Sequence, residues 1–398
     1  MFQQQETILQ VLPALETGGL ERGAIEIAGA VKQAGGRALI ASRGGALLPQ
    51  LRYVGGQHIP LDLKKKSLFS IFRRARDLQK IILKENVMLV HARSRIPAWS
   101  AWLACRRTGV PLVTTWHGVH HASWWGKKLY NSSLVKGQRV IAISEFIAER
   151  LRREYHVSEE RLRVIPRGAD ALYFNPEAIS GERIQKVAEA WSLPLDYRVI
   201  LMPARLTRWK GQGVLLEALT LLKKKQVDHP WICVFVGPVT DKKFAKYLLH
   251  RIRELDLSND VYFAGNCQDM PAAYALSSVV VTPSLRPEPF GRTVVEAQMM
   301  GKPVIGTAQG GMMETIIPEQ TGLVVPPNDP EALSDALCAV LGLGSESSQQ
   351  ISENARQNAL DHYTTQSMQA MTLAVYDEIL GTQLSGTFLG RDYGRPEE

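Results

Sequence analysis

Short apolar runs alternate along the chain with longer stretches whose apolar residues recur every three or four positions. The first run, at residues 7–12, precedes a stretch at 20–34 in which positions 25, 27, 28 and 31 are apolar. The alternation continues, with further predicted strands at 37–42, 87–91, 112–116, 139–143, 199–202 and 231–236. Strands that alternate with amphipathic helices are typical of parallel sheets covered by helices. The pattern predicts an α/β protein, and 398 residues suffice for two doubly wound parallel-sheet domains.

Proline, glycine and polar residues divide this pattern into segments. We expect a first domain at residues 1–175, a linker at 176–195 and a second domain at 196–362, with helices at 363–380 after it. The polar segment 381–398 is predicted to be disordered.

One strand-to-helix turn in the second half carries two carboxylates. An apolar run leads into a proline-rich loop with Glu288, and a helix with Glu296 follows. Open parallel sheets bind ligands beyond the carboxyl ends of their strands, and the N–H groups of Gly291, Arg292 and Thr293 would face a phosphate at the start of the helix. Thr293 and Glu296 also fit a capping box, in which Glu296 reaches back to the helix N-terminus. The turn alone leaves both interpretations open, and Glu288 alone could be a solvated loop acid.

Two cations follow the strand predicted at 199–202. Arg205 and Lys210 lie five residues apart in the loop before the next helix. An arginine fork and a lysine point charge together suit a pyrophosphate, whose departure they would stabilise. Solvated charges are the alternative.

The first half offers polar groups at the equivalent edge of its sheet. Gly18 and Gly19 follow the first strand without a G-x-G-x-x-G pattern, although a glycine pair there still lets a bulky ligand approach the backbone. His117 follows the strand at 112–116, and a histidine at such a place is by itself more often structural or solvated. Arg93 and Arg95 follow the preceding strand, where solvated side chains are favoured over binding of an acidic acceptor. No carboxylate or cysteine joins the histidines at ligand spacing, so no metal site is predicted.

The net charge of +8 is distributed unevenly. Residues 1–180 hold 27 lysines and arginines against 14 acidic residues, whereas the remainder holds 20 against 25. A basic first domain suggests an anionic partner, either a membrane surface, a phosphorylated lipid or nucleic acid. Because this half lacks a recognisable nucleic-acid-binding motif, we expect no nucleic acid partner and favour anionic lipid.

The segment 61–85 concentrates this positive charge. Basic residues stand at 64, 65, 66, 73, 74, 76, 80 and 84, and apolar residues at 68, 71, 72, 78, 81 and 82 would gather mostly on one side of a helix. Such a helix suits an anionic lipid surface. For the apolar face, packing on the domain's own sheet is the favoured alternative, and the basic face would reach headgroups in either case.

Several features concern the cellular compartment. No apolar run approaches the length needed to span a bilayer, and the first residues lack the basic region of a signal peptide. Four scattered cysteines give neither a disulfide framework nor a zinc motif. We therefore expect a cytoplasmic protein that associates peripherally with the inner face of the membrane.

The two-carboxylate turn resembles a family signature. The run Glu288-Pro289-Phe290-Gly291 with Glu296 is similar to the E-x7-E motif of retaining glycosyltransferases with the GT-B fold, above all glycosyltransferase family 4. The resemblance covers nearly the whole chain and is concentrated in residues 199–326. Further matching positions are Arg205, Leu206, Lys210 and Gly211, with Ala204 in place of the family's first glycine, and Pro283, Ser284, Gly301 to Ile305, Gly310, Gly311 and Glu314.

The resemblance implies a fold and an activity. The fold would be GT-B, with two Rossmann-like domains that face each other across a cleft, the first binding the acceptor and the second the nucleotide-sugar. The last helices would cross back to the first domain. The activity would be retaining transfer of a hexose-type sugar from a UDP- or GDP-linked donor to a glycolipid or lipopolysaccharide-core acceptor. No D-x-D occurs in the chain, so no metal or other cofactor is expected.

The resemblance also implies roles for individual residues. Arg205 and Lys210 would hold the diphosphate, Glu288 would hold sugar hydroxyls, and His117 would approach the donor from the first domain. Arg167 stands where the family usually has asparagine, which leaves its role open. The residues expected to bind the donor are Gly18, Gly19, Gly237, Asn266, Phe290, Gly291, Arg292, Thr293 and Glu296, the last through the ribose. The alternatives are a nucleotide-sugar epimerase and a non-catalytic nucleotide- or carbohydrate-binding protein of the same fold.

Overall fold

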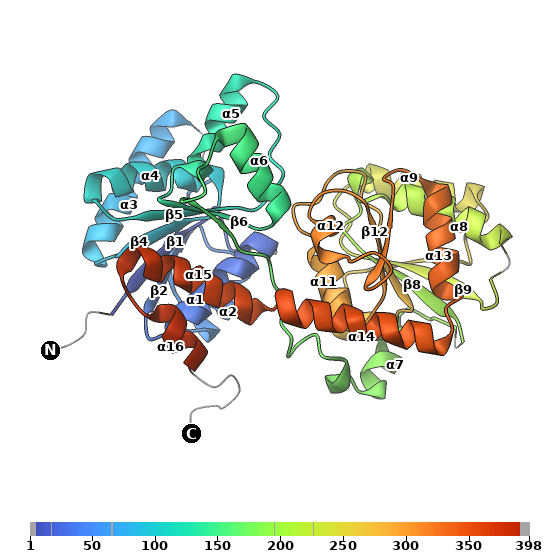
Figure 1. Cartoon of the computed structure of the whole chain (residues 1–398). Coiled ribbons are helices and arrows are strands. Elements are labelled where there is room, and N and C mark those ends of the chain that lie inside the picture. Colours follow the sequence, from blue (N-terminus) through green and yellow to red (C-terminus); the bar gives the residue numbers. More distant parts are fainter. Residues whose placement is uncertain (1–4, 17, 65–66, 195, 226, 391–398) are drawn as a thin grey trace. The chain divides into compact units, whose positions relative to one another are not determined.

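The computed structural model describes residues 5–16, 18–64, 67–194, 196–225 and 227–390, in which the chain forms two compact units (Figure 1). Unit 1 comprises Met1–Pro166 together with Thr365–Glu398, and unit 2 is Arg167–Thr364. The chain therefore passes from one unit to the other twice.

Unit 1 is built on a seven-stranded sheet in the order β3-β2-β1-β4-β5-β6-β7. Every pair of neighbours is parallel. The strands are β1 (Thr7–Val11), β2 (Arg37–Ser42), β3 (Gln57–Pro60), β4 (Leu89–Ala92), β5 (Leu112–Trp116), β6 (Arg139–Ala142) and β7 (Leu162–Val164). Because the order reverses between β1 and β4, this is the doubly wound sheet that the alternation predicted.

Helices cover unit 1 where the sequence has apolar stripes. The predicted positions on α1, Ile25, Ile27, Ala28 and Val31, are all buried. The Ser144 hydroxyl accepts a hydrogen bond from the Ile147 N–H at 3.2 Å and so caps α6. The helices are α1 (Gly19–Gln33), α2 (Leu48–Tyr53), α3 (Leu68–Lys84), α4 (Arg95–Thr108), α5 (Trp125–Asn131), the 3-10 turn η1 (Ser132–Val135), α6 (Glu145–Tyr155), α15 (Thr365–Leu380) and α16 (Leu384–Gly390).

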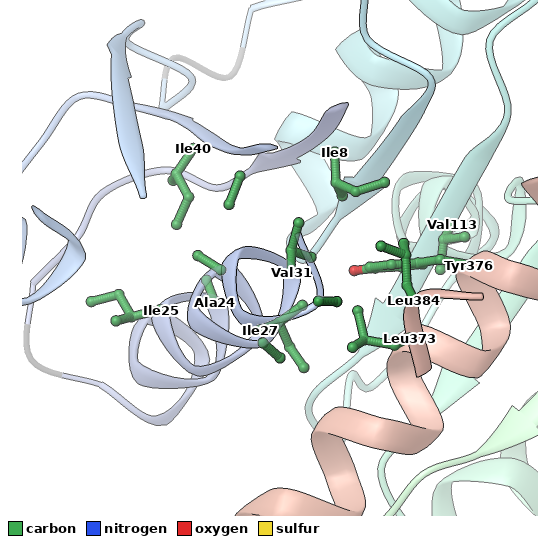
Figure 2. Close-up of a cluster of buried hydrophobic side chains, with 14 of the residues drawn as sticks. Ile8, Ala24, Ile25, Ile27, Val31, Ile40, Val113, Leu373, Tyr376 and Leu384 are labelled. Atoms are coloured by element: carbon green, nitrogen blue, oxygen red, sulfur yellow. The ribbon is translucent and has the colours of Figure 1, made fainter. Parts of the chain in front are cut away.

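The C-terminal helices form part of the core of unit 1. Figure 2 shows Leu373 and Tyr376 of α15 and Leu384 of α16 beside the α1 side chains, and Phe388 belongs to the same cluster. The Asp377 carboxylate accepts the N–H groups of Leu384 and Ser385 at 2.7 and 2.8 Å, which starts α16. The prediction of disorder from residue 381 is therefore wrong for Leu384–Gly390, which form a helix with Leu384 and Phe388 buried. Residues 391–398 lie outside the described part of the chain.

Unit 2 has a six-stranded parallel sheet in the order β10-β9-β8-β11-β12-β13. Its strands are β8 (Arg198–Pro203), β9 (Trp231–Val236), β10 (Val261–Gly265), β11 (Val279–Thr282), β12 (Val304–Thr307) and β13 (Gly322–Val325). Its helices are η2 (Pro176–Ala178), α7 (Gly181–Ala190), η3 (Arg208–Lys210), α8 (Gln212–Lys224), α9 (Lys242–Glu254), α10 (Met270–Leu276), α11 (Arg292–Met299), α12 (Met312–Thr315), α13 (Pro330–Leu341) and α14 (Ser345–His362). The strand order reverses between β8 and β11, so this sheet is doubly wound as well.

The segment expected to be a linker is instead an integral part of unit 2. Residues 176–195 contain α7, and Arg183 on this helix binds both carboxylate oxygens of Asp269 at 2.8 and 2.7 Å. Asp269 also accepts the Ala272 N–H and so caps α10, which ties the two helices together. The unit boundary falls between Pro166 and Arg167, so the first unit ends earlier than the predicted 175.

Candidate functional site

The predicted site residues of unit 2 cluster where the strand order reverses. The loop after β8 carries Arg205 and Lys210, and the loop after the neighbouring strand β11 carries Glu288. Parallel strands that are adjacent end at the same edge of the sheet, and ligands of open α/β sheets bind at such a reversal. The topology therefore brings together residues that are 78 positions apart.

Lys210 and Glu288 form an ion pair. The Nζ of Lys210 lies 2.6 Å from Oε1 of Glu288, and the two side chains are only 15% and 13% exposed. The Ser284 hydroxyl donates to the same oxygen. A carboxylate accepts about four hydrogen bonds, so Glu288 retains acceptor capacity for the hydroxyls of a ligand.

The backbone around the pair leaves no room for side chains at two glycines. Gly211 has φ +85°, and a Cβ there would lie 1.8 Å from the carbonyl oxygen of Pro283. Gly310 has φ +66°, and its Cβ would lie 2.5 Å from the carbonyl oxygen of Glu288. The Gly311 N–H donates to that oxygen at 2.8 Å. Both positions require glycine, and they fix the loops on which Lys210 and Glu288 stand.

Arg205 provides a cation that is available to a ligand. Its side chain is exposed, and within the described ranges it forms no ion pair and no hydrogen bond. Its carbonyl oxygen accepts the side-chain N–H of Gln212 at 3.0 Å, which holds the loop against α8. The neighbouring Arg208 lies instead over the rings of Phe244 and Tyr247, at 5.2 and 5.3 Å.

Helix α11 begins one residue after Gly291, which is its N-cap with φ +108°. Thr293 is the second helical residue, so the capping box that Thr293 and Glu296 suggested is wrong. The Glu296 carboxylate instead accepts from Arg292 Nε at 3.2 Å and from the hydroxyl of Tyr274 at 3.0 Å. Burial and the neighbouring Glu296 raise the pKa of Tyr274 well above its usual value, so its hydroxyl remains a donor.

The remaining residues predicted in unit 2 have different surroundings. The Phe290 ring is 3% exposed and packs on Tyr363 at a centroid distance of 5.7 Å, so it anchors the loop and only its backbone can meet a ligand. Gly237 follows β9, and its N–H donates to Gly265 at 2.7 Å. Asn266 follows β10 and is exposed. Both lie at the same sheet edge as Lys210, but on the other side of β8 from β11.

Three predicted residues belong to unit 1. Gly18 is the N-cap of α1, Gly19 is its first residue, and His117 follows β5. The nearby His120 has a pKa lowered to about 4, by burial first and then by Arg95 and Arg150, so this ring is neutral at neutral pH.

Arg93 departs from the prediction of a solvated side chain. It is 3% exposed, and its Nε donates to Oε1 of Gln10 at 2.7 Å. Burial lowers its pKa. Arg93 is therefore part of the interior of unit 1, because the strand order puts β4 beside β1 and Gln10.

Two contributors to the site were not assigned from the sequence. Ser284 belonged to the matched pattern, but its hydrogen bond to Glu288 depends on the turn after β11. Tyr274 lies 22 residues before Glu296 on another helix. A buried tyrosine near a strand gives no sign of its partner, so only the tertiary structure finds it.

Within the described ranges, no group of three or more His, Cys, Asp or Glu residues is placed to hold a metal ion. The chemistry available at the edge of the unit 2 sheet is that of two cations, two carboxylates and the first N–H groups of α11.

Two doubly wound parallel-sheet domains, with cations and carboxylates at the strand reversal of the second, define the GT-B class of folds. Residues 17–171 match the family model described as Glycosyltransferase Family 4, and residues 184–358 match Glycosyl transferases group 1. The chain is 38% identical to a glycosyltransferase of Rickettsia africae of known crystal structure, with a TM-score of 0.88 and coverage of 95% of this chain and 99% of that one. The chain belongs to glycosyltransferase family 4.

Other relatives are more distant. The D-inositol 3-phosphate glycosyltransferase of Jonesia denitrificans is 27% identical over 315 residues, which are 73% of this chain and 71% of that protein. The structure of Anabaena HepE in complex with UDP and glucose is 23% identical, with a TM-score of 0.80 and coverage of 93% of this chain and 99% of that one. At this identity HepE supports the fold alone.

Proposed function

We propose that the chain is a retaining glycosyltransferase that moves a hexose-type sugar from a UDP- or GDP-linked donor to a lipid-linked or lipopolysaccharide-core acceptor. The observation that carries this proposal is the Lys210–Glu288 ion pair at the strand reversal, with the exposed Arg205 on the same loop as Lys210. The UDP bound to HepE and the glycosyltransferase activity in the names of the relatives support a nucleotide-sugar donor.

In this proposal the diphosphate of the donor competes with Glu288 for the ammonium of Lys210. Arg205 adds a second positive charge, and the first N–H groups of α11 at Gly291, Arg292 and Thr293 add partial positive charge. These groups stabilise the diphosphate as the bond to the sugar breaks and negative charge develops on the leaving oxygen. The same charges replace those of a metal, so the transfer is proposed to need none.

The carboxylates hold hydroxyl groups in this scheme. Glu288, released from part of its pairing with Lys210, accepts hydrogen bonds from the sugar. Glu296 binds the ribose, because its orientation is already fixed by Tyr274 and Arg292 while lone pairs remain. Gly237 and Asn266 would provide backbone and polar contacts in unit 2, and Gly18, Gly19 and His117 keep the donor-binding roles that the family resemblance implies.

Helix α3 supports a membrane-associated acceptor. Its apolar residues divide into two sets, unlike the single stripe that the sequence suggested. Ile71, Leu78 and Ile82 are at most 9% exposed and pack within unit 1. Phe69 is 78% exposed and Phe72 51%.

The outward set lies among cations. At 100° per residue, the exposed Arg73, Arg76 and Lys80 fall on the same side of α3 as Phe69 and Phe72. Exposed aromatic rings among basic side chains suit the boundary between anionic headgroups and acyl chains. None of the helices in the described part of the chain is long and apolar enough to cross a membrane. We propose peripheral attachment to the inner face of the membrane through this side of α3.

A ligand screen followed by a transfer assay tests the central proposal. UDP- and GDP-sugars are added separately, and the matching donor is expected to raise the melting temperature by mass action. The matching donor is then incubated with lipopolysaccharide-core or glycolipid acceptors, and the anomeric configuration of the product is determined. Conversion of the donor to its epimer without an acceptor would instead indicate an epimerase, and binding without turnover would indicate a non-catalytic protein.

A further inference from the structure

Unit 2 contains a cavity of about 570 Å³ at the edge of its sheet where the strands begin. Arg198 is the first residue of β8, Ser278 precedes β11, and Lys302 lies two residues before β12. Lys210 and Glu288 follow the carboxyl ends of the same strands, at the opposite edge. The cavity is therefore separate from the candidate donor site, and its volume is in the range of small-molecule pockets.

The lining of the cavity is polar and positively charged. Arg198 and Lys302 contribute the charges, and no aspartate or glutamate is present among the described residues that line it. The Nζ of Lys302 donates one hydrogen bond to the carbonyl oxygen of Ala275 at 2.8 Å. An ammonium has three N–H bonds, so two can serve a ligand. Further hydroxyl groups come from Ser278, Ser345, Ser348 and Ser352, whereas the Ser277 hydroxyl donates to the Tyr274 carbonyl at 2.8 Å. Gln349 and apolar residues such as Leu276 and Val340 complete the lining.

The start of helix α14 adds to this positive potential. Ser345 and Ser348 belong to its first turn, and the N-cap, Gly344, has no side chain that could accept a hydrogen bond from that turn. In the described part of the chain, the Ser348 N–H is the one N–H of this turn that has a backbone acceptor, the Gly344 carbonyl at 3.0 Å. Unpaired N–H groups at a helix start favour an anion. Glu346 lies in the same turn, but it is exposed and does not line the cavity.

We propose that this cavity is a second binding site of the protein and that it takes a small phosphorylated sugar or polyol. Arg198, Lys302 and the start of α14 would bind the phosphate. The serine hydroxyls would bind the hydroxyl groups of the ligand, because a phosphate alone would leave most of the volume unfilled. The absence of carboxylates from the described lining is what favours an anion over a neutral sugar.

The state of Lys302 is consistent with this assignment. Burial lowers the pKa of Lys302 to about 8, since its charge is poorly solvated without a ligand. Arg198, the other charged residue of the lining, keeps its charge at any pH of interest. A phosphate monoester is a dianion above a pH of about 6. Binding should therefore weaken as the pH rises from 7 to about 9.5, where Lys302 is neutral.

The test is calorimetric titration of the full-length protein with glucose 6-phosphate, with glucose as the control ligand. We expect binding of the phosphorylated sugar only, with affinity at least about tenfold lower in Lys302→Gln and Arg198→Gln, because each removes one cation from the phosphate. Lys186→Gln, an exposed lysine of α7, is the matched control and should bind normally. Ser345→Ala, in the exposed first turn, gives a second variant in case Lys302→Gln is unstable.

Competition with UDP separates the two sites. Saturating UDP should leave the affinity for glucose 6-phosphate unchanged, and Lys210→Met should do the same. The proposal would be overturned if UDP displaced glucose 6-phosphate, if glucose bound equally well, or if the affinity were unchanged in all three cavity variants. It would also be overturned if glucose 6-phosphate failed to bind at millimolar concentrations. None of these outcomes depends on whether the donor site is catalytic.

Discussion

The ammonium of Lys210 and the carboxylate of Glu288 lie 2.6 Å apart, each on a loop that follows one of the two strands at the reversal in unit 2. Both side chains are largely buried, so neither charge is well solvated without the other. A donor diphosphate can take the ammonium only if something else compensates the carboxylate. Sugar hydroxyls and the Ser284 hydroxyl can do so, and the pair is therefore well suited to bind a phosphate and a sugar together.

The pair predicts a non-additive pattern of stability. Lys210→Met leaves a buried carboxylate, and Glu288→Gln leaves a buried ammonium, so each should lower the free energy of unfolding of unit 2 by about 1–3 kcal/mol. The double variant should be more stable than the sum of the two losses predicts, by about 1 kcal/mol or more. Urea unfolding followed by hydrogen exchange in β8 and β11 measures this. Strict additivity would show that the two charges are not coupled.

The same variants should lose sugar transfer by about 100-fold or more, since each removes a group that acts on the diphosphate or the sugar. The loss should persist in the double variant even though stability is partly restored. Arg208→Met is the control, because this neighbouring cation lies over Phe244 and Tyr247 rather than on Glu288. Normal transfer in both single variants, with donor and acceptor identified, would refute the assignment of the site.

Removal of metal ions should leave activity intact. In the proposed mechanism, Arg205, Lys210 and the start of α11 would provide the positive charge that a divalent cation could otherwise provide. We expect the same initial rate, within about twofold, with and without EDTA. Loss of turnover on chelation that Mg²⁺ or Mn²⁺ restores would contradict the proposal.

The outward side of α3 should bind anionic vesicles. Phe69→Ser with Phe72→Ser should weaken binding to vesicles that contain phosphatidylglycerol, because two rings no longer insert. Replacing Arg73, Arg76 and Lys80 with glutamine should remove the salt dependence of binding and weaken binding by about 1 kcal/mol for each charge removed. Tyr53→Ser is the control, an aromatic residue on α2 that is 92% exposed. Equal binding of neutral and anionic vesicles, or an equal effect of Tyr53→Ser, would exclude this surface.

The sequence predicted the sheets better than it predicted the surfaces between elements. Buried parallel strands such as β8 and β11 are short apolar runs, and glycines mark the turns near them. The local sequence pattern therefore predicts where these strands lie along the chain. The inward and outward sets on α3 could not be separated, because Ile71 and Phe72 are equally apolar and only the neighbouring α4 decides which one is covered. Phe388 was misjudged for a similar reason, since four of the other six residues of α16 are glycine, serine or threonine and give little sign of a core.

The candidate site shows the same division. Glu288, Lys210 and Glu296 were predicted because they stand at turns whose residues resemble the family 4 pattern, and their roles remain predictions. Lys210 pairs with Glu288 because the strand order places their loops side by side, and Tyr274 pairs with Glu296 because helix packing brings their side chains together. The residues near each partner in the sequence do not predict either pairing. The capping box failed because a glycine with positive φ, Gly291, starts α11 two residues earlier than Thr293 could cap it.

Unit 1 should lose stability in mild acid. His91 is fully buried between Tyr376 and Thr115, with hydrogen bonds of 2.6 and 2.7 Å, and burial followed by Arg93 lowers its pKa well below the usual value. The unfolded chain binds a proton near pH 6.5 whereas the folded chain does not. Stability therefore falls as the pH drops below about 6.5, by about 1.4 kcal/mol per pH unit for this residue.

Comparison of His91→Gln with the parent tests this. The variant should be less stable at pH 7.5 but should show a smaller loss between pH 7.5 and 5.5, measured by hydrogen exchange in β4. His120, whose pKa is also lowered, contributes in the same direction, so some pH dependence remains. His250→Gln, on α9 of unit 2, should leave the slope of unit 1 unchanged. An unaltered slope in His91→Gln would show that His91 does not contribute.

Helix α16 should be essential to the stability of unit 1. Phe388 is 1% exposed in the core shared with α1 and α15, and Phe388→Ala removes the whole ring, so we expect the free energy of unfolding to fall by about 3–5 kcal/mol. The adjacent Leu389 is 56% exposed, and Leu389→Ala should change stability by less than about 0.5 kcal/mol. Denaturant unfolding of the two variants, with hydrogen exchange in α1 to locate the effect, makes the comparison. Because Leu384 and Phe388 of α16 belong to the core cluster of unit 1, binding of UDP by unit 2 should be retained. Equal stability of the two variants would mean that this helix is a dispensable tail.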